Sequence, residues 1–326
     1  MSNQKLLTSL VTLMILFTIL LGACAQAAAP VATTTPQPVT LKIAVLPILE
    51  TLPMYVAQQK GYFEANGVKV EFIPVQSAAE RDQIMAAGQA DGMINDLVST
   101  LFYNREKTQI QIVRFARTAT PEYPQYRILA AKESGITTVE GLKGVSIGIS
   151  EGSVIAYTTD RLLQAEGLSA EEIKTIAVPK ITDRQALLAS GELKAANMPD
   201  PFSLLAIQGG AVDILNDSKH PEYGNSVISF RKAVIDENAP AVRSFLSAVE
   251  QATQDINADK AQWNNLLIEQ KLVPAPLVGT YIIPTLPSSS LPSEAQWKDV
   301  LEWAKGKGLI SNDVSYQDSV NGSLLP

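Results

Sequence analysis

Apolar and polar residues follow one another in short blocks from Leu41 to Asp96, and each block fits one strand or one helix. Gly61 and Gly88 stand where two helices would end, because glycine readily adopts the left-handed conformation found there. Ser77 and Glu80 have the spacing of a capping box, which begins a helix. The expected elements are strands at 41–45, 68–73 and 92–95 and helices at 54–60 and 77–88.

This alternation of strands and helices predicts a parallel sheet with helical crossovers. Ligands of such sheets bind beyond the carboxyl ends of the strands. The loops at 46–53, 74–77 and 95–99 each follow a predicted strand, so we expect a ligand-binding site among them.

A second region repeats this plan. Ser77–Asp96 and Thr182–Asp200 each contain a cap, a helix, a glycine, a short strand and a loop with Asn or Asp. A strand at 145–149 precedes a helix at 154–166 whose apolar residues share one face. The sequence therefore predicts an α/β protein with two similar lobes, each a mostly parallel sheet flanked by helices.

The lobe boundaries are expected where the chain crosses between these units. We assign 40–127 with 229–326 to lobe 1 and 128–228 to lobe 2. The crossings near 126–130 and 227–231 would act as a hinge, since paired crossings absorb the backbone change of lobe closure.

The N-terminal residues have the features of a targeting segment. Lys5 precedes an apolar run at 10–21, which is too short for a comfortable membrane span and fits a secretory signal. Leu21-Gly-Ala-Cys24 resembles the lipobox of bacterial lipoproteins, which implies a signal peptide at 1–23 and a lipid on Cys24. The alternative is an ordinary signal peptide with a chance cysteine. Residues 24–39 lack charge and are expected to form a flexible tether.

Composition narrows the function classes. The 326 residues carry a net charge of −7 and no dense Lys/Arg run, which argues against nucleic acid as a partner. One cysteine and one histidine, His220, leave little for a metal site or a Ser–His–Asp triad, and no G-x-S-x-G elbow is present. We therefore expect no metal, no cofactor and no enzymatic activity.

Three motifs carry a family resemblance: Pro53 before Tyr-Val-Ala, the run Lys60-Gly-Tyr-Phe-Glu-x-x-Gly-Val68, and Ala87-Gly-Gln-Ala-Asp91. They resemble substrate-binding proteins of ABC importers, in the branch of the sulfonate, taurine, nitrate and thiamine-pyrimidine (NMT1/THI5-like) binders. The resemblance implies the type II periplasmic-binding-protein fold. It also implies a monomer on the outer face of the cytoplasmic membrane that delivers a small polar or anionic molecule to a permease and its ATPase.

Polar residues at strand exits supply the candidate ligand contacts. Ser153 could bind an anion at a helix N-terminus or only cap the helix. Tyr157 could face the cleft or the core, and Ser77 is expected mainly as a cap. Asp200 could bind ligand or cap the helix that follows. The full set is Leu49, Glu50, Thr51, Ser77, Asn95, Asp96, Arg117, Glu151, Gly152, Ser153, Tyr157 and Asp200.

The ligand itself stays open at this point. Ser153 and Arg117 favour an anion, although Arg117 could equally be a surface arginine. Glu50 and Asp200 favour a polar nitrogen compound, although Glu50 could be a solvated loop acid. Two other functions are also open: a sensory partner that hands the ligand to a receptor, and an enzyme on the same fold.

Overall fold

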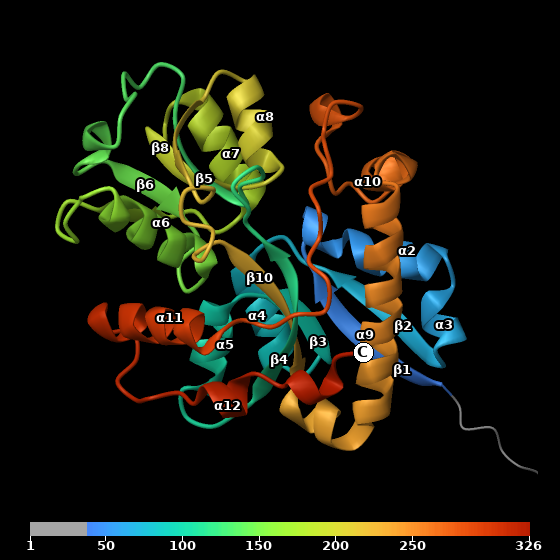
Figure 1. Ribbon diagram of the computed structural model, residues 1–326. Coiled ribbons are helices and arrows are strands. Elements are labelled where there is room, and N and C mark those ends of the chain that lie inside the picture. Colours follow the sequence, from blue (N-terminus) through green and yellow to red (C-terminus); the bar gives the residue numbers. More distant parts are fainter. Residues whose placement is uncertain (1–37) are drawn as a thin grey trace, which may run out of the picture. The chain divides into compact units, whose positions relative to one another are not determined.

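The computed structural model describes residues 38–326 (Figure 1). The expected signal peptide at 1–23, Cys24 and the expected tether up to residue 37 lie outside the described residues. Val39, the last residue assigned to the tether, begins strand β1 (Val39–Val45). Within the described part, none of the helices combines the length and hydrophobicity needed to cross a membrane.

The first sheet has the strand order β2-β1-β3-β10-β4. β1 pairs in parallel with both of its neighbours, and its register against β2 runs from Val39 opposite Val68 to Val45 opposite Pro74. β10 is antiparallel to β3 and β4, so four of the five strands run in one direction. The other strands are β2 (Val68–Pro74), β3 (Gly92–Asn95), β4 (Ile110–Thr118) and β10 (Asn225–Arg231).

The second sheet repeats this arrangement with the order β7-β6-β8-β5-β9. β6 is parallel to β7 and β8, and β5 is the antiparallel strand between β8 and β9. Its strands are β5 (Tyr126–Ala130), β6 (Ser146–Ile149), β7 (Lys174–Ala177), β8 (Ala195–Pro199) and β9 (Val212–Asn216). The predicted α/β architecture with two mostly parallel sheets is confirmed.

The chain changes sheets in the loops at 119–125 and 217–224. The boundaries expected from the sequence, at 127/128 and 228/229, fall inside β5 and β10, a few residues later. The reason is that each of these strands lies wholly in one sheet, so the crossing is made by the loop before it. Asp217 joins the two loops by accepting the backbone N–H groups of Gln125 (2.8 Å) and Tyr126 (3.1 Å).

Helices cover the faces of both sheets, as Figure 1 shows. In the first sheet's unit, α2 and α3 pack against the long α9. Asn238 interrupts α9 with non-helical dihedrals two residues before Pro240. α11 begins with a capping box formed by Ser293 and Gln296. The helices are α2 (Leu52–Gln59), α3 (Tyr62–Ala65), α4 (Ala78–Ala86), α5 (Leu97–Asn104), α6 (Val154–Ala165), α7 (Ile181–Ser190), α8 (Phe202–Gln208), α9 (Lys232–Ala258), α10 (Asn264–Glu269), α11 (Glu294–Gly306) and α12 (Tyr316–Ser319), with 3-10 turns η1 (Leu49–Thr51), η2 (Glu140–Leu142), η3 (Ala261–Trp263), η4 (Ala275–Leu277) and η5 (Gly322–Leu324).

Candidate functional site

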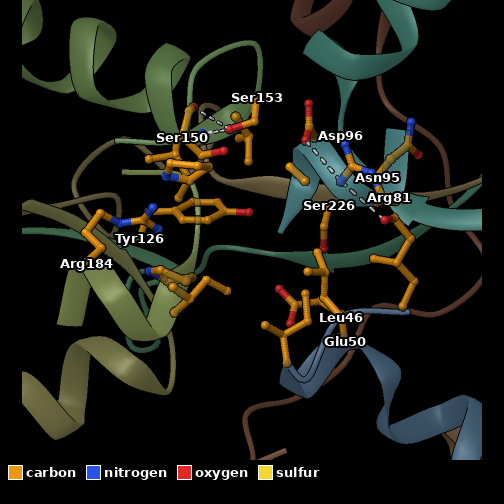
Figure 2. Close-up of a pocket in the computed structure, with 18 residues that line it drawn as sticks. Leu46, Glu50, Arg81, Asn95, Asp96, Tyr126, Ser150, Ser153, Arg184 and Ser226 are labelled. Atoms are coloured by element: carbon orange, nitrogen blue, oxygen red, sulfur yellow. Dashed lines mark hydrogen bonds and ion pairs between the residues drawn. The ribbon is translucent and has the colours of Figure 1, made fainter. Parts of the chain in front are cut away.

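A cavity lies between the two sheets, where strands from both end (Figure 2). It holds about 550 Å³ of empty space, counting its opening to solvent. In Figure 2, Tyr126, Ser150, Ser153 and Arg184 form one wall, and Leu46, Glu50, Arg81, Asn95, Asp96 and Ser226 form the other. The remaining lining residues are Ile48, Ala78, Ile94, Val154, Ile155, Pro179, Ile181 and Pro199.

Glu50 belongs to the 3-10 turn η1 that follows β1, and its side chain is buried. Gln125 donates a hydrogen bond to one carboxyl oxygen at 2.7 Å, and the other oxygen, Oε2, has no partner among the described residues. Burial raises the pKa of Glu50, and the nearby Arg117 opposes that shift only in part. The turn therefore places a buried carboxyl with hydrogen-bonding capacity left over at the cavity.

Arg81 of α4 and Asp96, which follows β3, stand together on the same wall. The Arg81 guanidinium lies 2.9 Å from Asp82 and 3.8 Å from Asp96, and Asp96 also caps α5 by accepting the Ser99 N–H. Burial raises the pKa of Asp96, while Arg81 and the N–H of Val154 across the cavity lower it. Charge on this wall is thus largely balanced within the protein, although Arg81 Nη2 has no partner in the described part.

The opposite wall begins at the exit of β6. Ser153 is the N-cap of α6: its hydroxyl accepts the Ile155 N–H at 3.3 Å and donates to the Ser150 carbonyl at 2.8 Å. The Ser150 hydroxyl is buried and lacks any hydrogen-bond partner in residues 38–326. Ser153 therefore does cap its helix, whereas the Ser150 hydroxyl keeps its hydrogen-bonding capacity unused in the described residues.

Arg184 of α7 is the second cation of the cavity, and only 1% of its surface is exposed. Its Nη1 donates to the Val178 carbonyl at 2.6 Å, and its Nε has no partner among the described residues. Burial alone lowers the pKa of Arg184 to about 10, since no carboxylate is close enough to oppose it. Gly148 of β6 lies beside this stem, but the glycine makes room for Leu193: a Cβ there would lie 2.6 Å from Leu193 Cδ1 and in ordinary contact, at 3.4 Å, with Arg184 Cγ.

Arg117 and Asp200, two other candidates, do not line this cavity; they lie beside the crossing loops. Their side chains form a buried ion pair of 2.9 Å, and Asp200 also accepts the hydroxyl of Tyr281 and lies 3.8 Å from Arg127. Arg117 is thus neither a surface arginine nor part of the cavity lining. We call Arg117, Arg127, Asp200 and Tyr281 the Asp200 cluster.

The structure divides the sequence candidates as follows. Glu50, Asn95, Asp96 and Ser153 line the cavity. Six other candidates do not line it. Leu49 is in the core, Thr51 donates to backbone carbonyls, and Ser77 caps α4. Glu151 is exposed, Gly152 takes a φ of 62° in the turn, and Tyr157 is buried with its hydroxyl donating to Asp299 at 2.5 Å.

Sequence reasoning did not select Tyr126, Ser150, Ser226 or the two arginines of the cavity. Ser150 directly precedes Glu151, Gly152 and Ser153, which are among the sequence candidates. Arg81 and Arg184 stand in the repeated segments 77–96 and 182–200, one turn into each helix, so the repeat itself was the available signal. In the described residues, no cluster of three or more His, Cys, Asp or Glu side chains could hold a metal ion.

Two mostly parallel sheets joined by two crossings, with a cavity between them, define the type II periplasmic-binding-protein fold. The chain belongs to the NMT1/THI5-like family, whose model matches residues 49–262. Its fold is similar to the alkanesulfonate-binding protein SsuA of Xanthomonas axonopodis pv. citri, solved with MOPS bound. The TM-score is 0.75 at 20% identity, over 88% of this chain and 99% of that one.

Curated relatives carry different functional names. A putative aliphatic sulfonates-binding protein of Escherichia coli is 26% identical over 170 residues, 52% of this chain and about half (53%) of that protein. The riboflavin-binding protein RibY of Chloroflexus aurantiacus is 25% identical over 97% of both chains. A 4-amino-5-hydroxymethyl-2-methylpyrimidine phosphate synthase of Aspergillus parasiticus is 24% identical over 70% of this chain and 68% of its own length.

Proposed function

We propose that this protein is an extracytoplasmic solute-binding protein that captures a small polar or anionic organic molecule between two lobes and delivers it to an ABC importer. One observation carries the binding role. Four buried side chains of the cavity, Glu50, Arg81, Ser150 and Arg184, each have a polar atom without a partner in the described residues. Buried polar atoms are rarely left unpaired, so a ligand that completes these hydrogen bonds accounts for them. The names of the sulfonate- and riboflavin-binding relatives support the same role.

Mass spectrometry of small molecules released from the denatured protein tests this function directly. A thermal-shift screen of organic solutes on the ligand-free protein complements it. A ligand at 100 times its dissociation constant should add about 2.7 kcal/mol to the free energy of unfolding. The proposal fails if nothing is released and no solute raises the melting temperature.

The membrane anchor is proposed from the lipobox at Leu21–Cys24, outside the described residues. Only a thiol can take the diacylglyceryl group, so Cys24→Ser should abolish incorporation of labelled fatty acid. The wild type should be labelled in the same expression host. Equal labelling of both proteins would exclude Cys24 as the lipid attachment site.

A second candidate function is catalysis, because one relative is named as a pyrimidine phosphate synthase. Incubating the ligand released from the protein with fresh protein separates the two functions. A binding protein returns the compound unchanged, whereas an enzyme converts it to a product of different mass.

A further inference from the structure

Two helices, one behind each wall of the cavity, carry an arginine at the same place. Arg81 is the fourth residue of α4, and Arg184 is the fourth residue of α7. The amide N–H of each donates to the residue before its helix, Ser77 or Lys180, at 3.0 Å. Both residues are at most 2% exposed and both line the cavity. The repeated architecture thus brings two guanidinium groups to one site from opposite walls.

The two arginines differ in their acid partners. Asp82, the next residue after Arg81, lies 2.9 Å from its Nε, and Asp96 lies 3.8 Å from its Nη1. The corresponding neighbour of Arg184 is Gln185, and Arg184 forms no ion pair with any described residue. In α4, Arg81 Nε donates to Asp82. In α7, the same atom of Arg184 has no partner among the described residues.

The other cationic feature of the cavity, the N-terminus of α6, already faces a carboxylate. The Val154 N–H at the start of α6 points toward Asp96 closely enough to lower the pKa of that carboxyl. The Ser153 hydroxyl is engaged with Ile155 and Ser150. A negatively charged ligand at this helix end would meet Asp96, so the helix end is not the preferred place for an anionic group.

Burying a cation without a counter-charge is costly, and proteins keep buried charges when they are paired. A guanidinium presents its donors in a planar fork that suits carboxylate and sulfonate oxygens. Around these polar groups the lining is apolar, with Leu46, Ile48, Ile94 and Ile181 among its members. The cavity is therefore suited to an organic molecule with one charged end.

We infer that Arg184 binds the single anionic group of the ligand, with the Ser150 hydroxyl as the free donor on the same wall, and that Arg81 orders the facing wall together with Asp82 and Asp96. The ligand class is an organic monoanion, such as a sulfonate or a carboxylate, with an apolar body. This inference rests on the proposed function and specifies its ligand.

Pairs of probes that differ only in charge test it. Each anion is compared with its neutral amide: methanesulfonate with methanesulfonamide, benzenesulfonate with benzenesulfonamide, and acetate with acetamide. Binding is measured by thermal shift at up to 0.1 M probe and by calorimetry. The anions should raise the melting temperature of the wild type and the amides should not. Arg184→Gln should weaken anion binding about tenfold to a hundredfold, the loss expected for hydrogen bonds to a charged group.

Two variants control for folding. Arg184→Lys keeps the charge without the planar fork and should recover part of the anion affinity, whereas Arg243→Gln, at an exposed arginine, should bind as the wild type does. Amides that bind as well as anions, or unchanged anion affinity in Arg184→Gln, would overturn the inference and leave the proposed function standing. Absence of any anion response in the wild type also overturns it. The proposed function then depends on whether a neutral ligand binds or is released from the purified protein.

Discussion

The Asp200 cluster and the cavity use the same kinds of side chain in opposite ways. In the Asp200 cluster, Arg117 is buried against Asp200 at 2.9 Å, and Asp200 also accepts the Tyr281 hydroxyl. In the cavity, Arg184 is equally buried but has no carboxylate partner among residues 38–326. A buried arginine that finds its acid within the chain contributes to the fold. The Nε atoms of Arg117 and Arg184 both lack a partner in the described residues, so the two regions differ in whether the arginine has a carboxylate partner.

The largest expected effect is on stability, and it comes from breaking the ion pair between Arg117 and Asp200. Arg117→Met leaves Asp200 buried without its closest counter-charge, which should lower the free energy of unfolding by about 3–5 kcal/mol. Urea denaturation of the ligand-free protein measures the change. Arg184→Met is the matched control, and its loss should be smaller, about 1–3 kcal/mol, because the Val178 carbonyl loses a donor but no carboxylate loses a counter-charge. Equal losses in the two variants would contradict the distinction between the regions.

The next effect is on affinity, from giving Arg184 the partner that Arg81 has. Gln185→Asp places a carboxylate at the position equivalent to Asp82, and it should weaken binding of benzenesulfonate about tenfold, or roughly 1.4 kcal/mol. Calorimetry at constant ionic strength measures the dissociation constant. Gln185→Asn keeps the amide without adding charge and should bind as the wild type does. A stronger anion complex in Gln185→Asp would show that Arg184 does not carry the binding charge.

The sequence predicted the architecture well, because alternating strands and helices with glycine stops leave few alternatives to two mostly parallel sheets. It also selected Glu50, Asn95, Asp96 and Ser153, which line the cavity because they follow strands. Tyr157 could not be placed in advance, because only the fold shows that its side chain lies against α11, where its hydroxyl donates to Asp299 and its ring packs edge-on against Trp303.

The arginines were harder to find from the sequence. Arg81 and Arg184 are in the first turns of helices, where arginine is ordinarily a solvated surface residue. Their burial depends on tertiary contacts inside each unit, such as Arg81 with Asp96 and Arg184 with the Val178 carbonyl, which no local pattern encodes. Arg117 was selected for its charge, but the position of its partner Asp200, 83 residues further along the chain, decides its role.

The smallest expected effect is that of replacing Ser153. This replacement tests whether Ser153 only caps α6 or also binds the ligand on the wall that carries Arg184. Its hydroxyl accepts the Ile155 N–H and donates to the Ser150 carbonyl, so both of its local bonds are internal to the loop and helix. Ser153→Ala should therefore cost about 1 kcal/mol of stability through the lost cap. The dissociation constant for benzenesulfonate should change less than twofold.

Ser150→Ala is the informative partner, because the Ser150 hydroxyl has no bond to lose among the described residues. That variant should keep its melting temperature and bind the anion more weakly. Calorimetry and thermal unfolding of both variants measure the two quantities together. If Ser153→Ala weakens binding while Ser150→Ala does not, the helix end rather than Arg184 and Ser150 holds the anion.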